Sequence, residues 1–197
     1  MNEANGIVSF TEFGLNLGGF NFTAEGIFEL TRRNYSEINL YASYTLAGFT
    51  LTLADYYSAE GVHGHSYFDL NNHTTSHSLE LGLTFEPENV PIWASVNTML
   101  WGNDKDEELG KQLYSTYIEV GGYYDFENNS TVSLGIGAGL PNSMYSDYEP
   151  KFSICNMELT YEKRLEYEHF TLPLSVSLIG NPFLRKTYVN CGVGISF

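Results

Sequence analysis

The chain alternates apolar and polar residues with a period of two, over segments of about ten residues. The clearest segment runs from Thr187 to Phe197. One of its faces would carry Val189, Cys191, Val193, Ile195 and Phe197. The other face would carry tyrosine, asparagine, glycine and serine. Because successive side chains of a strand point to opposite faces, the pattern predicts strands with one apolar face and one small or polar face.

Eleven such segments follow one another along the chain, and the helix period is almost absent. They cover about residues 6–16, 20–31, 35–46, 48–57, 75–86, 91–101, 113–126, 131–138, 151–162, 169–179 and 187–197. The first is the least regular, because Ile7 to Leu17 gives no consistent apolar face without a bulge. A segment of about ten residues is long enough for a tilted strand to cross a bilayer. We therefore expect an all-β domain.

The connections between these segments alternate in length. Short ones lie at 18–19, 47–48, 86–90, 127–130 and 163–168. Longer ones lie at 58–74, 102–112, 140–150 and 180–186, while the short stretch 32–34 breaks the trend. Short turns on one side and long loops on the other are typical of bacterial outer-membrane barrels. The sequence thus predicts an antiparallel up-and-down transmembrane β-barrel of about 10–12 strands.

A soluble β-sandwich or lipocalin-like barrel is the alternative fold. Its outer face would be rich in lysine and glutamate, whereas the polar faces here carry serine, threonine, glycine, asparagine and tyrosine with scattered glutamate. Only 17% of the residues are charged, below the roughly 25% of ordinary soluble domains. Nine Lys and Arg stand against 24 Asp and Glu, so the basic surface that nucleic-acid binding requires is absent. We expect no nucleic-acid partner.

Several runs of residues carry a resemblance to a known family. Phe197, preceded by alternating apolar residues, looks like the terminal strand that is recognised when outer-membrane barrels are assembled. Further runs are Tyr35–Thr45, Leu53–Tyr57, His77–Glu80, Tyr114–Glu119, Leu172–Leu174, Asn181–Pro182 and Gly194–Phe197. Together, over about residues 35 to 197, they resemble the TorF-type porin family and related outer-membrane β-barrel proteins.

The resemblance implies a location in the cell outer membrane, with lipid, lipopolysaccharide and the barrel-assembly machinery as partners. It supplies neither a defined solute nor catalytic residues. The polar N-terminus, Met1 to Asn5, has no signal-peptide pattern, so we expect the leader to have been removed. An even strand number is usual in single-chain bacterial barrels. Eleven segments therefore mean either that an N-terminal strand is missing from about twelve or that one early segment does not span, and we expect the former.

If the apolar faces meet lipid, the polar faces line the interior. The residues expected to line a pore are Glu37, Glu80, Glu119, Glu158, Asn97, Asn156 and Tyr117. A carboxylate lining favours cations over anions. Two hypotheses follow: passive diffusion of small solutes through a cation-preferring lumen, or a closed structural or ligand-binding barrel. In the closed barrel, these carboxylates would bond to interior tyrosine, asparagine and arginine side chains.

The histidines of the longest loop are weaker candidates for a site. His63, His65 and His73 precede His77, with Asp55 and Asp69 nearby. Imidazole and carboxylate groups suit a transition metal, but loop histidines are more often solvated. We expect no metal and no cofactor.

We also expect no enzymatic activity. His77 and Ser78 are neighbours in a strand and point to opposite faces, so they do not form a base and nucleophile pair. The acidic run Asp104, Asp106, Glu107 and Glu108 lacks the spacing of a calcium loop. We expect it to be a solvated outer loop.

Overall fold

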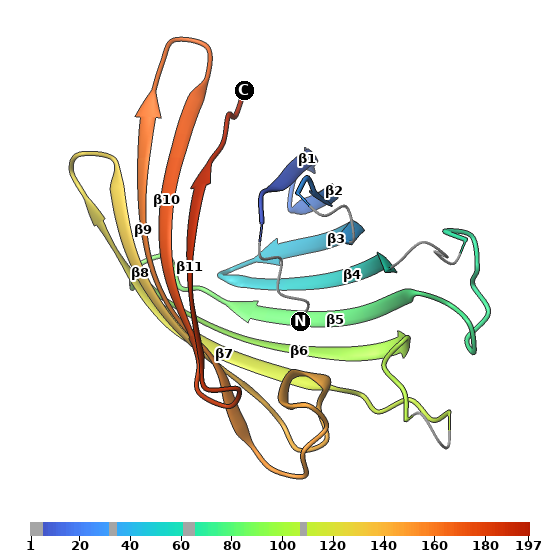
Figure 1. Cartoon of the computed structure of the whole chain (residues 1–197). Coiled ribbons are helices and arrows are strands. Elements are labelled where there is room, and N and C mark those ends of the chain that lie inside the picture. The colour runs from blue at the N-terminus through green and yellow to red at the C-terminus, as the bar shows by residue number, and fades with distance from the viewer. Residues whose placement is uncertain (1–5, 32–34, 61–65, 107–109) are drawn as a thin grey trace. The chain divides into compact units, whose positions relative to one another are not determined.

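The computed structural model describes residues 6–31, 35–60, 66–106 and 110–197. It contains eleven strands, which pair only with their neighbours in sequence to form one antiparallel up-and-down sheet, in the order β1 to β11 (Figure 1). The strands are β1 (Val8–Leu17), β2 (Phe20–Glu29), β3 (Tyr35–Leu46), β4 (Phe49–Glu60), β5 (His77–Phe85), β6 (Ile92–Gly102), β7 (Thr116–Phe126), β8 (Ser130–Gly139), β9 (Ser153–Glu166), β10 (Thr171–Asn181) and β11 (Lys186–Val193).

The all-β prediction is confirmed, and each predicted segment corresponds to one strand. Within the described residues, the strand order includes no pairing between β1 and β11. No helix in the described part of the chain is long and apolar enough to span a membrane. A short 3-10 helix, η1 (Met144–Ser146), lies in the connection between β8 and β9.

The chain forms two compact units. Unit 1 consists of Met1–Thr84 and Val96–Thr116, and unit 2 of Phe85–Ser95 and Tyr117–Phe197. Unit 1 therefore holds β1 to β4, nearly all of β5 and most of β6. Unit 2 holds the start of β6, nearly all of β7, and β8 to β11.

The hairpin of β3 and β4 shows how a two-residue turn sets the register. The pairing runs from Tyr35↔Glu60 to Leu46↔Phe49. Ala47 and Gly48 remain in the turn, with φ of 51° and 79°. Positive φ at both central residues is the type I′ geometry, whose twist matches that of the flanking strands. The register places Asn39 opposite Tyr56, which matters for the site described below.

Two expectations from the sequence are corrected by the register. The connection predicted at 180–186 is shorter, because β10 extends to Asn181 and pairs there with Lys186. The first strand needs no bulge, since β1 pairs continuously with β2 from Val8↔Glu29 to Leu17↔Phe20. Its apolar pattern is irregular because Phe10 shares the polar face.

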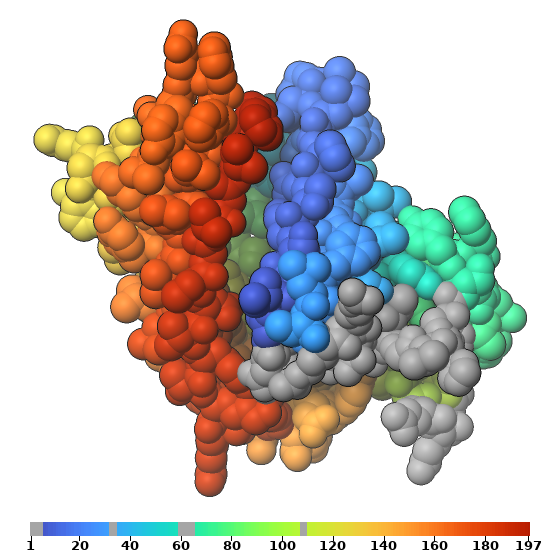
Figure 2. Space-filling model, turned by 45° about the horizontal axis from the view of Figure 1, so that its top comes forward, coloured from blue at the N-terminus to red at the C-terminus, as the bar shows by residue number. Residues whose placement is uncertain are grey.

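The apolar face of the strands is the exposed one. On β8, Leu134 and Ile136 are exposed, whereas Gly135 and Gly137, which alternate with them, are buried. On β9, Met157, Leu159 and Tyr161 are exposed, whereas the residues between them are half-buried. Figure 2 shows β10 and β11, in orange and red, with their side chains at the molecular surface.

The covered side of the sheet is polar. The buried hydrophobic residues of the described part are Ala54, Tyr57, Met99, Ala138 and Cys155. The largest fully buried side chains are Asn39, Asp104, Ser115, Ser143 and Ser146. A water-soluble domain buries leucine, isoleucine, valine and phenylalanine first. The distribution found here is the reverse, with the large aliphatic residues facing outward.

The turn between β3 and β4 yields a test of the fold. Alanine is disfavoured at positive φ by about 1–2 kcal/mol, whereas asparagine tolerates it. We expect Ala47→Asn to raise, and Gly48→Ala to lower, the free energy of unfolding, by about 0.5–1 kcal/mol each. The midpoint of urea unfolding of the refolded chain in detergent measures both changes. Shifts of the same sign in the two variants would contradict the assigned turn.

Candidate functional site on the polar face

The seven residues predicted to line a pore all lie on the polar face of the sheet, in two groups. Tyr117, Glu119, Asn156 and Glu158 belong to unit 2, on β7 and β9. Glu37, Glu80 and Asn97 belong to unit 1, on β3, β5 and β6. The period-two pattern therefore predicted that they share one kind of face, and the structure places them so. The hydrogen-bonding partners described below depend on the register between strands.

In unit 2, Glu119 is the centre of a hydrogen-bonded cluster. Trp93 Nε1 donates to Glu119 Oε1 at 3.0 Å. The Tyr117 hydroxyl donates to Glu119 Oε2 at 2.6 Å. Both oxygens of this carboxylate are therefore bound by aromatic side chains from the neighbouring strand β6 and from its own strand. On β9, the Thr160 hydroxyl donates to Glu158 Oε1 at 2.9 Å.

Glu119 and Glu158 face one polar pocket of about 210 Å³. The pocket is lined by Trp93, Glu119, Ser133, Gly135, Asn156, Glu158 and Thr160. Its lining contains two carboxylates and no lysine or arginine. The pocket is large enough for several water molecules or for one small hydrated cation. Its chemistry therefore favours positive charge.

Glycines on the polar face make room for the aromatic rings. A Cβ atom at Gly121 would overlap the Trp93 ring, and one at Gly137 would overlap the Tyr117 hydroxyl. At Gly135 a Cβ would lie 3.3 Å from the Trp93 ring. Glycine in a strand often marks such a close approach of another group. The rings of Trp93 and Tyr117 therefore lie directly against the strand backbones, where they can reach Glu119.

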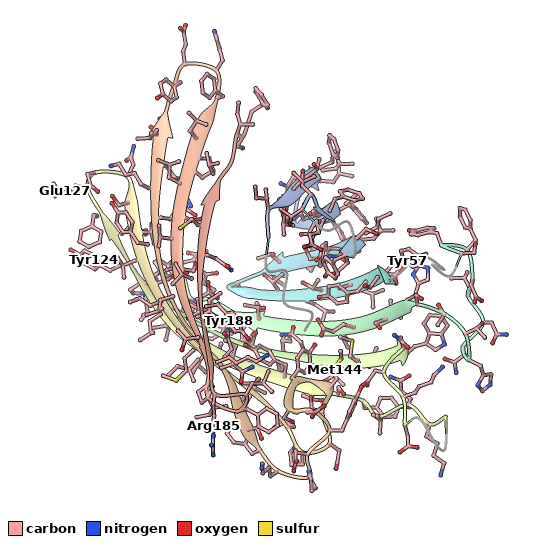
Figure 3. All side chains as sticks on the ribbon, viewed as in Figure 1. Tyr57, Tyr124, Glu127, Met144, Arg185 and Tyr188 are labelled. Atoms are coloured by element: carbon pink, nitrogen blue, oxygen red, sulfur yellow. The ribbon has the colours of Figure 1, made fainter. Side chains whose placement is uncertain are left out.

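The connection between β8 and β9 folds onto this polar face. Tyr145 in η1 packs against Tyr117, with ring centroids 5.1 Å apart. Ser143 and Ser146 are fully buried, and the Ser143 hydroxyl accepts the Tyr145 N–H at the start of η1. Met144, labelled in Figure 3, marks this loop. The length of the stretch 140–150 predicted a long loop but could not predict that it covers part of the polar face.

In unit 1, carboxylates and tyrosines form a second cluster. The Tyr56 hydroxyl donates to Glu80 Oε1 at 3.1 Å, and the Tyr35 hydroxyl donates to Glu37. Tyr41 and Tyr56 pack edge to face, with centroids 5.9 Å apart. Nearby, Asn39 Nδ2 donates to Glu25 Oε1 at 2.7 Å.

Asn97 occupies the same polar face of unit 1. Its Oδ1 lies 2.5 Å from the place where a Cβ of Gly82 would stand. This glycine on β5 thus leaves room for the asparagine side chain of β6. The close approach repeats in unit 1 the arrangement of glycine and large side chain found in unit 2.

The structure also brings together Asp55 and His77, for which the sequence predicted no contact. His77 Nδ1 lies 3.0 Å from both carboxylate oxygens of Asp55. His77 Nε2 lies 2.7 Å from the Tyr67 carbonyl oxygen. The His77 side chain is only 3% exposed, and the ring of Tyr57, labelled in Figure 3, packs against it.

Asp55 and His77 stand at positions whose side chains point to the apolar face of the sheet. Asp55 follows Leu53 on β4, and His77 precedes Leu79 on β5. A polar residue at an apolar position on each of two neighbouring strands was the sequence signal for this pair. Both ring nitrogens are occupied, one by a carboxylate and one by a main-chain carbonyl. Within the described residues, neither nitrogen contacts a hydroxyl or thiol, so the geometry is that of an anchor for the loop that carries Tyr67.

Of the three candidate metal ligands, the structure describes only His73. His63 and His65 lie outside the described residues, and His73 is exposed. In the part of the chain that the structure describes, no group of three His, Cys, Asp or Glu side chains is suited to hold a metal ion.

Asp104 was expected to be solvated, and this was wrong. Its side chain is fully buried, and it accepts hydrogen bonds from the Ser115 N–H at 2.8 Å and the Ser115 hydroxyl at 2.6 Å. Gln112 Nε2 adds a third bond at 3.2 Å. A carboxylate with several donors organises the loop between β6 and β7 in the way that aspartate commonly organises turns.

Comparisons with known protein families, curated proteins and solved structures find no match for this chain.

The fit between glycine and aromatic rings can be tested with tryptophan fluorescence. We expect Gly121→Ala to displace the Trp93 ring, to shift its emission to longer wavelength and to lower stability by about 1–3 kcal/mol, because the added methyl overpacks the site. Trp101→Phe leaves Trp93 as the sole tryptophan of the chain. Gly14→Ala is the matched control, since a Cβ there would meet nothing within 4 Å. Equal effects of the two alanine substitutions would rule out the proposed fit.

Proposed function

We propose that this chain is a transmembrane β-barrel of the Gram-negative outer membrane that lets small solutes diffuse passively, with a preference for cations. In this proposal the meander is part of a closed barrel of about 10–12 strands, in the manner of the TorF-type porins that the sequence resembles. The observation that carries it is the polarity of the sheet, whose exposed side chains are large and apolar and whose covered side chains are small or polar.

The exposed apolar face argues for a hydrocarbon environment. Leu134, Val176 and Leu178 are each about half exposed. Removing one such side chain fully from water stabilises a protein by about 1.5–3 kcal/mol. Soluble monomers rarely leave a large contiguous apolar patch in water. Lipid acyl chains would cover these side chains along every strand.

The apolar face of unit 1 also contains a hollow of about 490 Å³. Leu40, Leu53 and Leu79 of three neighbouring strands contribute to its lining, together with Phe13 and Phe22. Such a surface suits acyl chains of membrane lipid and of lipopolysaccharide. At the other end of the sheet, Phe197 is 95% exposed, which leaves the terminal segment accessible to the barrel-assembly machinery.

The closed barrel is the second candidate, and two observations favour it. Both oxygens of Glu119 are already bound by Trp93 and Tyr117. In addition, the loop that carries Tyr145 covers part of the same polar face. In a closed barrel these contacts would hold the interior together and no current would flow. The two candidates therefore differ in a directly measurable quantity.

The membrane proposal can be tested by cysteine labelling across residues 189–197. We expect a lipid-soluble maleimide to label single cysteines at 189, 191, 193 and 195 in liposomes, because these positions share the apolar face. Positions 190 and 192 should be labelled poorly. Cys155→Ala removes the buried native thiol, and Cys191→Ala removes the exposed one from every variant except the one that tests position 191. Equal labelling of odd-numbered and even-numbered positions would be evidence against a lipid-facing strand.

Cation preference can be tested in planar bilayers under a salt gradient. We expect the refolded chain to give stable steps whose reversal potential indicates cation selectivity. Replacing Glu80, Glu119 and Glu158 together by Gln should move the reversal potential toward zero, since it removes three carboxylates from the polar face. Glu162→Gln is the single-site control, because that carboxylate is paired with Arg164 at 2.6 Å. A silent but correctly folded protein would favour the closed barrel.

A further inference from the structure

We propose that the polar face of unit 1 binds the ammonium group of a small organic cation. The site consists of Glu25 on β2, Glu37, Asn39 and Tyr41 on β3, and Tyr56 on β4. This inference rests on the proposed cation route, to which it adds a binding site and a chemical class of ligand. Equilibrium binding to the site is measurable without a membrane.

The amide of Asn39 is the first observation. Asn39 is 2% exposed, and its Oδ1 has no hydrogen-bonding partner among the described residues. A buried acceptor without a partner is unfavourable, and nearly all buried polar atoms in proteins have a partner. An N–H donor brought by a ligand would satisfy this oxygen.

The orientation of the amide is fixed by its other end. Asn39 Nδ2 donates to Glu25 Oε1 at 2.7 Å. A flipped amide would place its oxygen against that carboxylate, and two acceptors do not bond. The Oδ1 is therefore the end turned away from Glu25. Its surroundings on the same face are Tyr56, opposite Asn39 in the register, and Glu37 and Tyr41, each two residues away on β3.

The charge of the cluster is the second observation. Glu25 bonds to Asn39 and Glu37 bonds to Tyr35. Neither carboxylate has a lysine or arginine partner among the described residues. Tyr41 lies close enough to Glu25, Glu37 and Glu80 to interact with all three electrostatically. Converging carboxylates in a partly desolvated place repel one another, and a bound cation relieves that repulsion.

The shape and chemistry of the cluster favour an ammonium group over a metal ion. An ammonium group carries three N–H donors, which can be shared between the Asn39 oxygen and the two carboxylates. The rings of Tyr41 and Tyr56 pack edge to face, with centroids 5.9 Å apart, and aromatic rings attract cations. The described residues contain no group of three side chains arranged for a metal ion.

This proposal can be tested by calorimetry. The full-length chain, refolded in detergent, is titrated with butane-1,4-diammonium chloride. We expect saturable binding with one molecule per chain. Tetramethylammonium, which has no N–H, should bind at least tenfold more weakly, because it cannot donate to Asn39. Binding of calcium chloride in place of the diammonium salt would overturn the proposal and indicate a site for a hard metal ion.

The double variant Glu25→Gln with Glu37→Gln should weaken diammonium binding by tenfold or more. Its near-isosteric amides retain an acceptor for Asn39. Asn39→Leu should weaken binding similarly, and Asn21→Leu, another asparagine of the polar face, is its matched control. Glu162→Gln controls for a change of charge. Unchanged affinity in the Gln double variant, or no binding to the parent chain, would show that the cluster is only structural.

The site and the proposed channel can fail independently. Diammonium binding by a chain that is silent in bilayers would disprove the channel and leave the site. Cation-selective current from a chain that binds no diammonium would disprove the site and leave the channel.

Discussion

Water is a poor solvent for the surface that this sheet exposes. The exposed face of each strand carries large apolar side chains, which are mainly leucine, isoleucine, valine and phenylalanine. The transfer of these side chains out of water is the largest favourable contribution to the free energy of folding. Backbone hydrogen bonds to a neighbouring strand on either side pair the main chain of β2 to β10. The sheet is therefore compatible with an apolar solvent on one side, provided that its other side keeps the polar groups together.

The polar face meets that condition by bonding its side chains to one another. Glu119 is bound by Trp93 and Tyr117, Glu80 by Tyr56, and Glu25 by Asn39. Glycines at positions such as 121 and 137 let the rings lie close to the backbone. Such contacts restrict side-chain rotation, so these carboxylates present fixed charges to whatever solvent or solute shares the polar face. The Asn39 amide differs, since its Oδ1 has no hydrogen-bonding partner in the part of the chain that the structure describes.

The alternation in the sequence was sufficient to predict where the strands lie and which side chains share a face. Alternation located β3 at 35–46, as found, and placed Glu37, Glu80, Glu119 and Glu158 on one kind of face. It could not supply contacts between strands, because these depend on register. Asn39 meets Glu25, and His77 meets Asp55, only because the turns and longer loops set particular alignments. The inward fold of the loop at 140–150 depends on local turn geometry and on Tyr145, neither of which has a periodic signal.

The order of the strands has a consequence for the route by which the chain folds. Every strand of the sheet pairs with the strand before or after it in sequence. Pairings between sequence neighbours have low contact order, and low contact order is associated with fast folding. Hairpins such as β3 with β4 can form early, around a two-residue turn, and each later strand then adds to an existing edge. A chain built in this way can lengthen its sheet strand by strand, without waiting for a distant segment to arrive.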